Sequence, residues 1–193
     1  MRIWLIRHGA TAHSEAGRYQ GSLDTPLSSG GRAALHPAGQ TPRRVRVSPL
    51  LRARETARIL FPEAEQIAVP GLEEMRFGAF EGRSAREMED DAEYRAWVDG
   101  FCVGRCPGGE DREEFSARCC AAFERAVAQA LDAGEEELFI VAHGGTQMAV
   151  LDRWGRPARS YYAWCARPGA GYVLDTAQWP EALRIVKEVD FTE

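Results

Sequence analysis

The apolar positions of the chain fall into short runs that are separated by longer segments with helical spacing. The runs cover residues 3–6, 44–47, 66–69, 138–142, 172–174 and 183–186. Several are apolar throughout, and such runs indicate strands buried on both faces, as in a mainly parallel sheet covered by helices. The alternation of strands and helices predicts an α/β fold, built as a three-layer α/β/α sandwich.

Three of the intervening segments have recognisable helix starts. Ser48 precedes a proline and residues 50–60, the order of an N-cap and a first-turn proline. Asp111 is the expected N-cap of a long helix, with Glu114 as its capping-box partner. Residues 146–154 form the third predicted helix, which begins just after two glycines.

The long helix has one apolar face. Its members recur at a spacing of four residues: Phe115, Cys119, Phe123, Val127 and Leu131. This spacing predicts a buried stripe, so Cys119 is expected to pack in the core. Tyr161 and Trp164 are also expected to pack in the core rather than to stack on a substrate ring.

Length and charge limit the function classes. The 193 residues suit one domain, 1–193, with a helical excursion over the site at about residues 81–109. The net charge of -5 and the dispersed arginines argue against binding to nucleic acid, so an anionic ligand should be small. No run of 18 apolar residues occurs, and we expect a cytoplasmic protein without a membrane segment.

The cysteines do not predict a metal site. Five are present, an odd number that favours free thiols over disulfides. Cys102 and Cys106 have a spacing that metal ligands can use, but no further pair or nearby histidine completes a set of four. We expect no metal and no cofactor. The sequence leaves open whether the protein is a monomer or a homodimer.

Two of the four histidines occupy matching positions. His8 follows the first apolar run and Arg7, His143 follows the fourth run, and a glycine comes directly after each histidine. Ligands of open α/β sheets bind at the carboxyl ends of strands. If these two strands are neighbours, both imidazoles face one site.

Four motifs, in order along the chain, resemble the histidine phosphatase superfamily. They are Arg7-His8-Gly9, Leu51-Arg52-Ala53 with Glu55-Thr56-Ala57, Leu72-Glu73-Glu74, and His143-Gly144-Gly145. The resemblance implies a phosphoglycerate mutase-like fold. It also implies a metal-independent phosphomonoesterase that acts through a phosphohistidine intermediate.

The resemblance assigns a role to each motif. His8 is the expected nucleophile. Arg7, Arg52 and a protonated His143 are expected to bind the phosphoryl oxygens. Glu74 is the expected proton donor to the leaving group, with the adjacent Glu73 as its competitor.

The segment after the first motif departs from the family pattern. The family often has Asn five residues after the glycine, where this chain has Ser14, whose shorter side chain is expected to reach phosphate less readily. Four consecutive residues, Arg18, Tyr19, Gln20 and Gly21, resemble a loop that lies over substrate, although an ordinary turn-rich connection fits equally well. Gly144 is also expected to contact substrate.

Within the superfamily, three details favour the α-ribazole phosphatases. They are the sequence of residues 18–21, the segment Pro107-Gly108-Gly109-Glu110, and His143-Gly144-Gly145-Thr146, where mutases usually have Gly-Asn after the histidine. The expected substrate is then a small phosphorylated metabolite, α-ribazole 5′-phosphate, in cobalamin nucleotide-loop assembly. The alternatives are a broad-specificity sugar or small-metabolite phosphatase, a phosphoglycerate mutase, and a non-catalytic phosphate-binding module.

Overall fold

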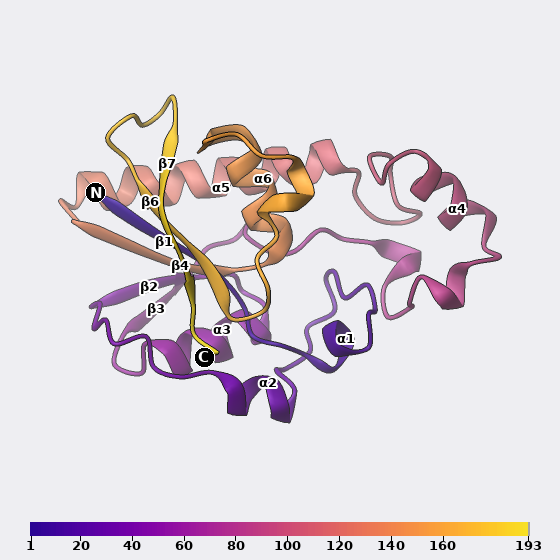
Figure 1. Cartoon of the computed structure of the whole chain (residues 1–193), viewed down its shortest axis with the longest axis horizontal. Coiled ribbons are helices and arrows are strands. Elements are labelled where there is room, and N and C mark those ends of the chain that lie inside the picture. Colours follow the sequence, from indigo (N-terminus) through magenta and orange to yellow (C-terminus); the bar gives the residue numbers. More distant parts are fainter. Residues whose placement is uncertain (193) are drawn as a thin grey trace.

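A twisted mixed sheet forms the centre of the computed structural model, which describes residues 1–192 (Figure 1). Within these residues the strands lie in the order β3 (Glu65–Ala68), β2 (Arg44–Val47), β4 (Glu137–Ala142), β1 (Arg2–Arg7), β6 (Ala170–Asp175), β7 (Leu183–Asp190) and β5 (Gly155–Arg156). The first four are parallel, whereas β6 is antiparallel to β1 and to β7. The predicted mainly parallel α/β sheet is therefore confirmed, and the short β5 is a strand that the apolar pattern did not predict.

Helices cover both faces of the sheet (Figure 1). The α-helices are α1 (Ala12–Glu15), α2 (Ser29–Ala34), α3 (Leu51–Leu60), α4 (Ala92–Asp99), α5 (Arg112–Asp132) and α6 (Gly144–Trp154). Three short 3-10 helices, η1 (Gly78–Phe80), η2 (Arg86–Met88) and η3 (Tyr161–Trp164), lie in the connections. Figure 1 shows α5 and α6 on one side of the sheet and α2 and α3 on the other.

Strand β1 shows why the sheet is buried on both sides. Ile3 and Leu5 belong to the apolar cluster on the α5 side, whereas Trp4 and Ile6 belong to the cluster on the α3 side. Alternate side chains of a strand point to opposite faces, so an apolar run of this length supplies both cores. The end of β1 is thereby held between two packed layers.

Of two predicted helix N-caps, one is confirmed and the other is wrong. Asp111 caps α5 as expected, since its side chain accepts from the amide of Glu114 at 2.8 Å. The expected cap at Ser48 is wrong, because α3 begins after Leu50 and has no side-chain cap. The Ser48 hydroxyl lies instead 2.7 Å from Nε2 of His143.

The apolar stripe of α5 is buried along most of its length. Phe115, Cys119, Phe123 and Val127 are buried, which confirms the core position of Cys119. The prediction that Leu131 packs in the core is wrong, since this residue is 44% exposed in the last turn of the helix. Trp164 is buried as predicted, whereas Tyr161 is only partly buried.

The segment 81–109 projects beyond one end of the sheet (Figure 1). It contains η2 and α4, and it packs on the loop of residues 18–21 through aromatic rings. Tyr19 contacts Tyr94 and Trp97 with ring centroids 5.9 and 5.8 Å apart, and its hydroxyl lies 3.0 Å from that of Tyr94. These contacts join the projecting segment to the region beside His8.

Candidate active site

His8 and His143 lie side by side at the carboxyl ends of two neighbouring strands. Strands β1 and β4 are parallel, and the amide of His8 donates to the carbonyl oxygen of Ala142 at 2.9 Å. The two imidazole rings meet edge to face, with centroids 5.2 Å apart. Both side chains are buried. The matching strand ends thus bring the two histidines together, as the sequence predicted.

Arg52 lies in the first turn of α3 and is fully buried. Its Nε donates to Nε2 of His8 at 3.2 Å, and its two terminal nitrogens donate to the carbonyl oxygens of Leu23 and Gly21, each at 2.8 Å. Burial lowers the pKa of Arg52 to about 10, so the side chain remains a cation at neutral pH. A buried cation therefore contacts His8 directly.

The hydrogen bonds of His8 define its tautomer. Its Nδ1 lies 2.7 Å from the carbonyl oxygen of Gly9, and because a carbonyl only accepts, Nδ1 carries the hydrogen. The Nε2 atom then has a lone pair, which accepts from Arg52. Burial, and next the charges of Arg52 and Arg7, lower the pKa of His8 well below its ordinary value. The ring is a neutral imidazole with its basic nitrogen toward Arg52.

In the free protein His143 is neutral as well, whereas the resemblance implied a protonated ring. Burial, followed by the charge of Arg52, lowers the pKa of His143 well below its ordinary value. The nearest charges are cations, so they oppose a further positive charge. Its Nε2 contacts the Ser48 hydroxyl at 2.7 Å.

Two nitrogens near these rings are buried without a hydrogen-bond partner in the described part of the chain. They are Nε of Arg7 and Nδ1 of His143. The terminal Nη1 of Arg7 donates to the carbonyl oxygen of Ala166 at 2.7 Å, which orients its guanidinium. Buried polar atoms are normally paired, and unpaired ones at a site with several cations fit contacts to an anion.

The carboxylate of Glu74 lies at the start of α6, beside His143. Its two oxygens accept from the amides of Gly145 at 3.1 Å and Met75 at 2.9 Å. The carboxylate of Glu73 instead accepts from the amide of Gly71 at 2.7 Å, within its own loop. Of the two adjacent acids, Glu74 is therefore the one that faces the histidine pair.

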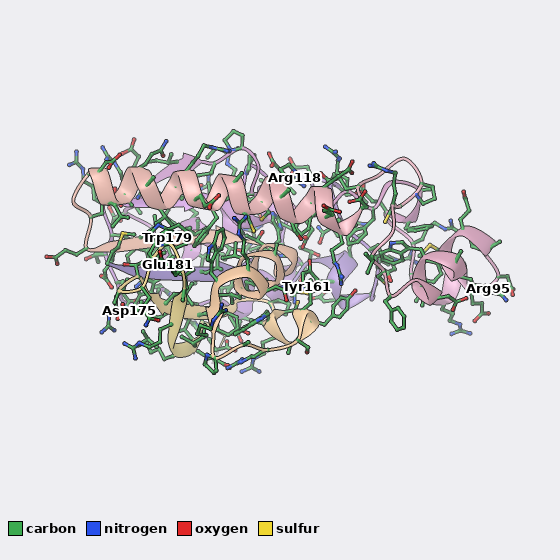
Figure 2. The ribbon with its side chains drawn as sticks, turned by 90° about the horizontal axis from the view of Figure 1, so that it is seen from above. Arg95, Arg118, Tyr161, Asp175, Trp179 and Glu181 are labelled. Atoms are coloured by element: carbon green, nitrogen blue, oxygen red, sulfur yellow. The ribbon has the colours of Figure 1, made fainter. Side chains whose placement is uncertain are left out.

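A partly buried ion pair holds the loop that carries Glu74. Arg118, labelled on α5 in Figure 2, donates to the carbonyl oxygens of Gly71 at 3.0 Å and Glu73 at 3.1 Å. It also pairs with the buried carboxylate of Glu110 at 2.8 Å, which in turn accepts from the amide of Arg76 at 3.0 Å. The backbone before and after Glu74 is thus held in place by hydrogen bonds.

The two glycines after His143 permit close approach. A Cβ at Gly145 would collide with the Glu74 carboxylate, and one at Gly144 would press on Sγ of Cys165 and approach Nε of Arg7 at 3.4 Å. The start of α6 can therefore lie this close to the side chains of Glu74 and Arg7 only because Gly144 and Gly145 have no Cβ. These glycines belong to the site through their lack of a side chain.

The loop of residues 18–21 borders the same region. Gly21 has a positive φ of 53°, and its carbonyl oxygen accepts a hydrogen bond from Arg52. Gln20 is buried and accepts from the hydroxyl of Thr11 at 2.9 Å. Arg18 pairs with Glu87 at 2.7 Å, so its charge is partly neutralised by the projecting segment.

The hydroxyl of Ser14 is used locally. It donates to the carbonyl oxygen of Thr11 at 3.0 Å and accepts from the amide of Thr11 at 2.9 Å, in the capping box of α1. Ser14 still lines the cavity beside His8.

A polar cavity of about 240 Å³ unites most of the predicted residues. Its walls include Arg7, His8, Ser14, Arg18, Tyr19, Gln20, Gly21, Arg52, Glu74 and Phe77. His143 lies behind His8, in ring contact with it. The cavity has cations, a neutral imidazole and a carboxylate within one small volume, which suits a phosphate ester.

Sequence reasoning did not assign two residues that support the site. Thr56 accepts from the amide of Gly9 at 3.0 Å and so connects α3 to the turn after His8. Ser48 contacts His143. Its position directly after β2 was the available signal, because strand ends meet at this edge of the sheet.

The described residues show neither a metal cluster nor a membrane span. In residues 1–192, no group of three or more His, Cys, Asp or Glu side chains is placed to hold a metal ion. No helix of this part of the chain is long and apolar enough to cross a membrane.

Comparisons with known proteins agree with this geometry. Residues 3–178 match the model of the histidine phosphatase superfamily (branch 1). The adenosylcobalamin/alpha-ribazole phosphatase of Salmonella typhimurium is 32% identical, over 96% of each chain. The crystal structure of the alpha-ribazole phosphatase from Shigella flexneri superposes with a TM-score of 0.79 at 30% identity, covering 96% of this chain and 95% of that one. The phosphoglycerate mutase from Thermus thermophilus gives a TM-score of 0.69 at 27% identity, over 98% of each chain.

Proposed function

Since the chain belongs to the histidine phosphatase superfamily (branch 1) and is a phosphatase, we propose that it hydrolyses α-ribazole 5′-phosphate through a phosphohistidine at His8. One observation carries the chemistry: the neutral His8 has its Nε2 lone pair beside the buried Arg52. The similarity to alpha-ribazole phosphatases over 96% of the chain supports the substrate.

The first step transfers the phosphoryl group to His8. The hydrogen bond from Nε of Arg52 shifts from Nε2 of His8 to a phosphoryl oxygen, and this frees the lone pair. The Nε2 lone pair then attacks phosphorus in line, and the bond from phosphorus to the ester oxygen breaks. Arg52 and Arg7 balance the charge on the phosphoryl oxygens. Glu74 gives its proton to the departing alkoxide, which leaves as the alcohol.

The second step returns the enzyme to its starting state. The carboxylate of Glu74 takes a proton from water as the water oxygen attacks phosphorus. The bond between phosphorus and Nε2 breaks, releasing inorganic phosphate and neutral His8. Glu74 thus acts first as acid and then as base.

In this proposal, His143 gains a proton when phosphate binds and then donates a hydrogen bond to it. Its ring is neutral among cations. A phosphoryl dianion brings opposite charge to the same region, which raises the affinity of the ring for a proton. Its buried Nδ1 is then a hydrogen-bond donor to the phosphoryl group.

The remaining cavity residues are proposed to border the substrate. Ser14 and the loop of Arg18, Tyr19, Gln20 and Gly21 line the polar cavity. Gly144 is proposed to contact the phosphate from its place beside Arg7. We place the reaction in the cytoplasm, on a small phosphorylated metabolite, with the protein as a monomer or homodimer and without metal or other cofactor.

Rapid-quench labelling tests the intermediate. With ³²P-labelled α-ribazole 5′-phosphate, the wild type should give an acid-labile, base-stable labelled protein, whereas His8→Ala should give none. Full turnover should continue in the presence of a chelator. Label that persists on His8→Ala would contradict the mechanism.

A panel of substrates tests which alcohol the enzyme recognises in the ester. Initial rates on α-ribazole 5′-phosphate should exceed those on sugar phosphates and nucleotides by more than about tenfold, or 1.4 kcal/mol in transition-state binding. A smaller preference would favour a broad-specificity phosphatase. Interconversion of 2- and 3-phosphoglycerate would favour a mutase, and the absence of turnover on every ester would favour a binding module.

A further inference from the structure

A second cavity, of about 250 Å³, adjoins the polar cavity that contains His8. The two cavities share Tyr19, Glu74 and Phe77 in their walls. The proposed proton donor therefore lies at the boundary between them. Any ester oxygen that contacts Glu74 has the phosphate on one side of it and the second cavity on the other.

The walls of the second cavity are mainly apolar and aromatic. Phe115 of α5, Met148 of α6, Tyr161 of η3 and Trp97 of α4 come from four separate elements. Figure 2 shows Tyr161 between the body of the molecule and the α4 extension, on which Arg95 is labelled. The guanidinium of Arg112 lies 4.8 Å from the centre of the Tyr161 ring and stacks on it.

Two exposed aromatic residues, Tyr162 in the cavity wall and Phe101 next to Cys102 of that wall, adjoin this cavity. Phe101 is 80% exposed and Tyr162 is 54% exposed, and the Tyr162 hydroxyl donates to the carbonyl oxygen of Phe101 at 3.2 Å. Phe101 and Cys102 both have positive φ, 59° and 56°, although neither is glycine. Exposed apolar side chains around an apolar cavity are typical of a binding site for an apolar ligand.

We propose that this second cavity binds the alcohol half of the substrate and selects a flat aromatic group. The inference rests on the proposed phosphatase reaction, because it uses the position of Glu74 at the leaving oxygen. Aromatic walls offer edge and face contacts to a planar ring. They offer few partners to sugar hydroxyls, which would lose water without compensation. The cavity thus favours an alcohol that carries an aromatic ring, as α-ribazole does, over a sugar of similar size without one.

Two simple esters test the inference without the natural substrate. The alcohols of 2-phenylethyl phosphate and ethyl phosphate are leaving groups of similar basicity, so the two esters differ mainly in the aromatic ring. We expect kcat/KM for the phenylethyl ester to be at least about tenfold higher, and higher than for glucose 6-phosphate by a similar factor. Equal values for the three esters would overturn the proposal.

Substitutions then test whether the second cavity causes the preference for the phenylethyl ester. Met148→Trp adds bulk to the second cavity and should bring the ratio of phenylethyl to ethyl turnover close to one, as should Tyr161→Ala by removing an aromatic wall. Ala163→Trp is the control, because it adds bulk on η3 but to a separate polar cavity. A ratio that Met148→Trp and Tyr161→Ala leave unchanged would overturn the assignment of this cavity.

The same experiments separate the two proposals. If ethyl phosphate labels His8 but the aromatic ester has no advantage, only the inference about the second cavity fails. If no ester labels His8, the proposed reaction itself fails.

Discussion

Nε2 of His8 accepts a hydrogen bond from Nε of Arg52 at 3.2 Å, in a fully buried contact between a neutral ring and a cation. In the free protein this contact and the hydrogen bond from Nδ1 to Gly9 orient the ring, and Arg52 must turn to a phosphoryl oxygen before the lone pair attacks. It also lowers the pKa of His8, so the nucleophile does not have to lose a proton before it attacks. One arginine therefore orients the nucleophile and keeps it unprotonated.

The two histidines should differ in labelling experiments. His8→Ala removes the attacking atom and should abolish both turnover and labelled protein. His143→Ala removes a donor to the phosphoryl group and should slow phosphoryl transfer by about 10²–10³, leaving a trace of labelled intermediate. Quench-flow labelling of both variants checks this, and equal loss of label in both would contradict the unequal roles.

The acid limb of the pH profile should depend on Arg52. Because burial and Arg52 lower the pKa of His8, wild-type kcat/KM should stay level from pH 7.5 to below about 6.5, the pKa of an unperturbed histidine. In Arg52→Gln one cause of the lowering is gone, so the acid limb should move to higher pH, besides a loss of overall rate. The measurement is kcat/KM against pH for both proteins. An acid limb at the same pH in both proteins would contradict the proposed effect of Arg52 on the pKa of His8.

Protein stability should also fall in weak acid. The folded-state pKa values of His8 and His143 lie below the ordinary value, so the unfolded chain binds more protons between the folded pKa and about pH 6.5. The free energy of unfolding is then greatest above pH 6.5. It should decrease as the pH falls further, by up to about 1.4 kcal/mol per pH unit for each histidine.

Urea denaturation at pH 7.5, 6.5 and 5.5 measures this dependence, with flanking pH values chosen about one unit either side of the ordinary histidine pKa. His8→Asn removes one titrating ring, so its slope between the two lower pH values should be shallower than that of the wild type. Parallel slopes for the two proteins would show that His8 does not contribute.

Glu74→Gln should affect poor leaving groups selectively. Turnover of an alkyl phosphate, whose alkoxide needs a proton, should fall by about 10²–10⁴, whereas formation of phosphohistidine from p-nitrophenyl phosphate should fall much less. Glu73→Gln is the matched control, since Glu73 accepts from Gly71 within its loop. If Glu73→Gln showed the leaving-group dependence instead, the assignment of the proton donor would shift by one residue.

Gly145→Ala should disturb the proton donor, and its methyl group would also lie 2.9 Å from Cζ of Phe115. The added methyl group collides with the Glu74 carboxylate, so kcat for alkyl phosphates should fall by about tenfold or more. Gly104→Ala is a suitable control, because a Cβ at Gly104 meets nothing within 4 Å. Equal rates for the two variants would show that Glu74 does not need the space at Gly145.

The sequence allowed the sheet and the histidine pair to be predicted because both depend on local patterns. Apolar runs followed by His-Gly mark strand ends, and parallel strands bring such ends together. The role of Ser48 was mispredicted because Ser-Pro before a helix also fits an N-cap, while its partner His143 is 95 residues away.

The charge of His143 and the second cavity depend on distant contacts. Burial and the positions of arginines from other segments determine whether His143 is protonated. Tyr161 was expected in the core, but it lines a cavity whose other walls come from α4, α5 and α6. No short motif encodes an arrangement assembled from so many segments.

The pairing of β1 has a consequence for synthesis of the chain. Both of its neighbours, β4 and β6, come from residues 137 onward, although β1 itself spans Arg2–Arg7. A growing chain therefore carries an apolar strand with both edges unpaired until β4 and β6 have been synthesised. Such edges promote aggregation. The geometry that unites His8 with His143 thus forms only after β4 has been synthesised, and until then β1 has no partner strand on that edge.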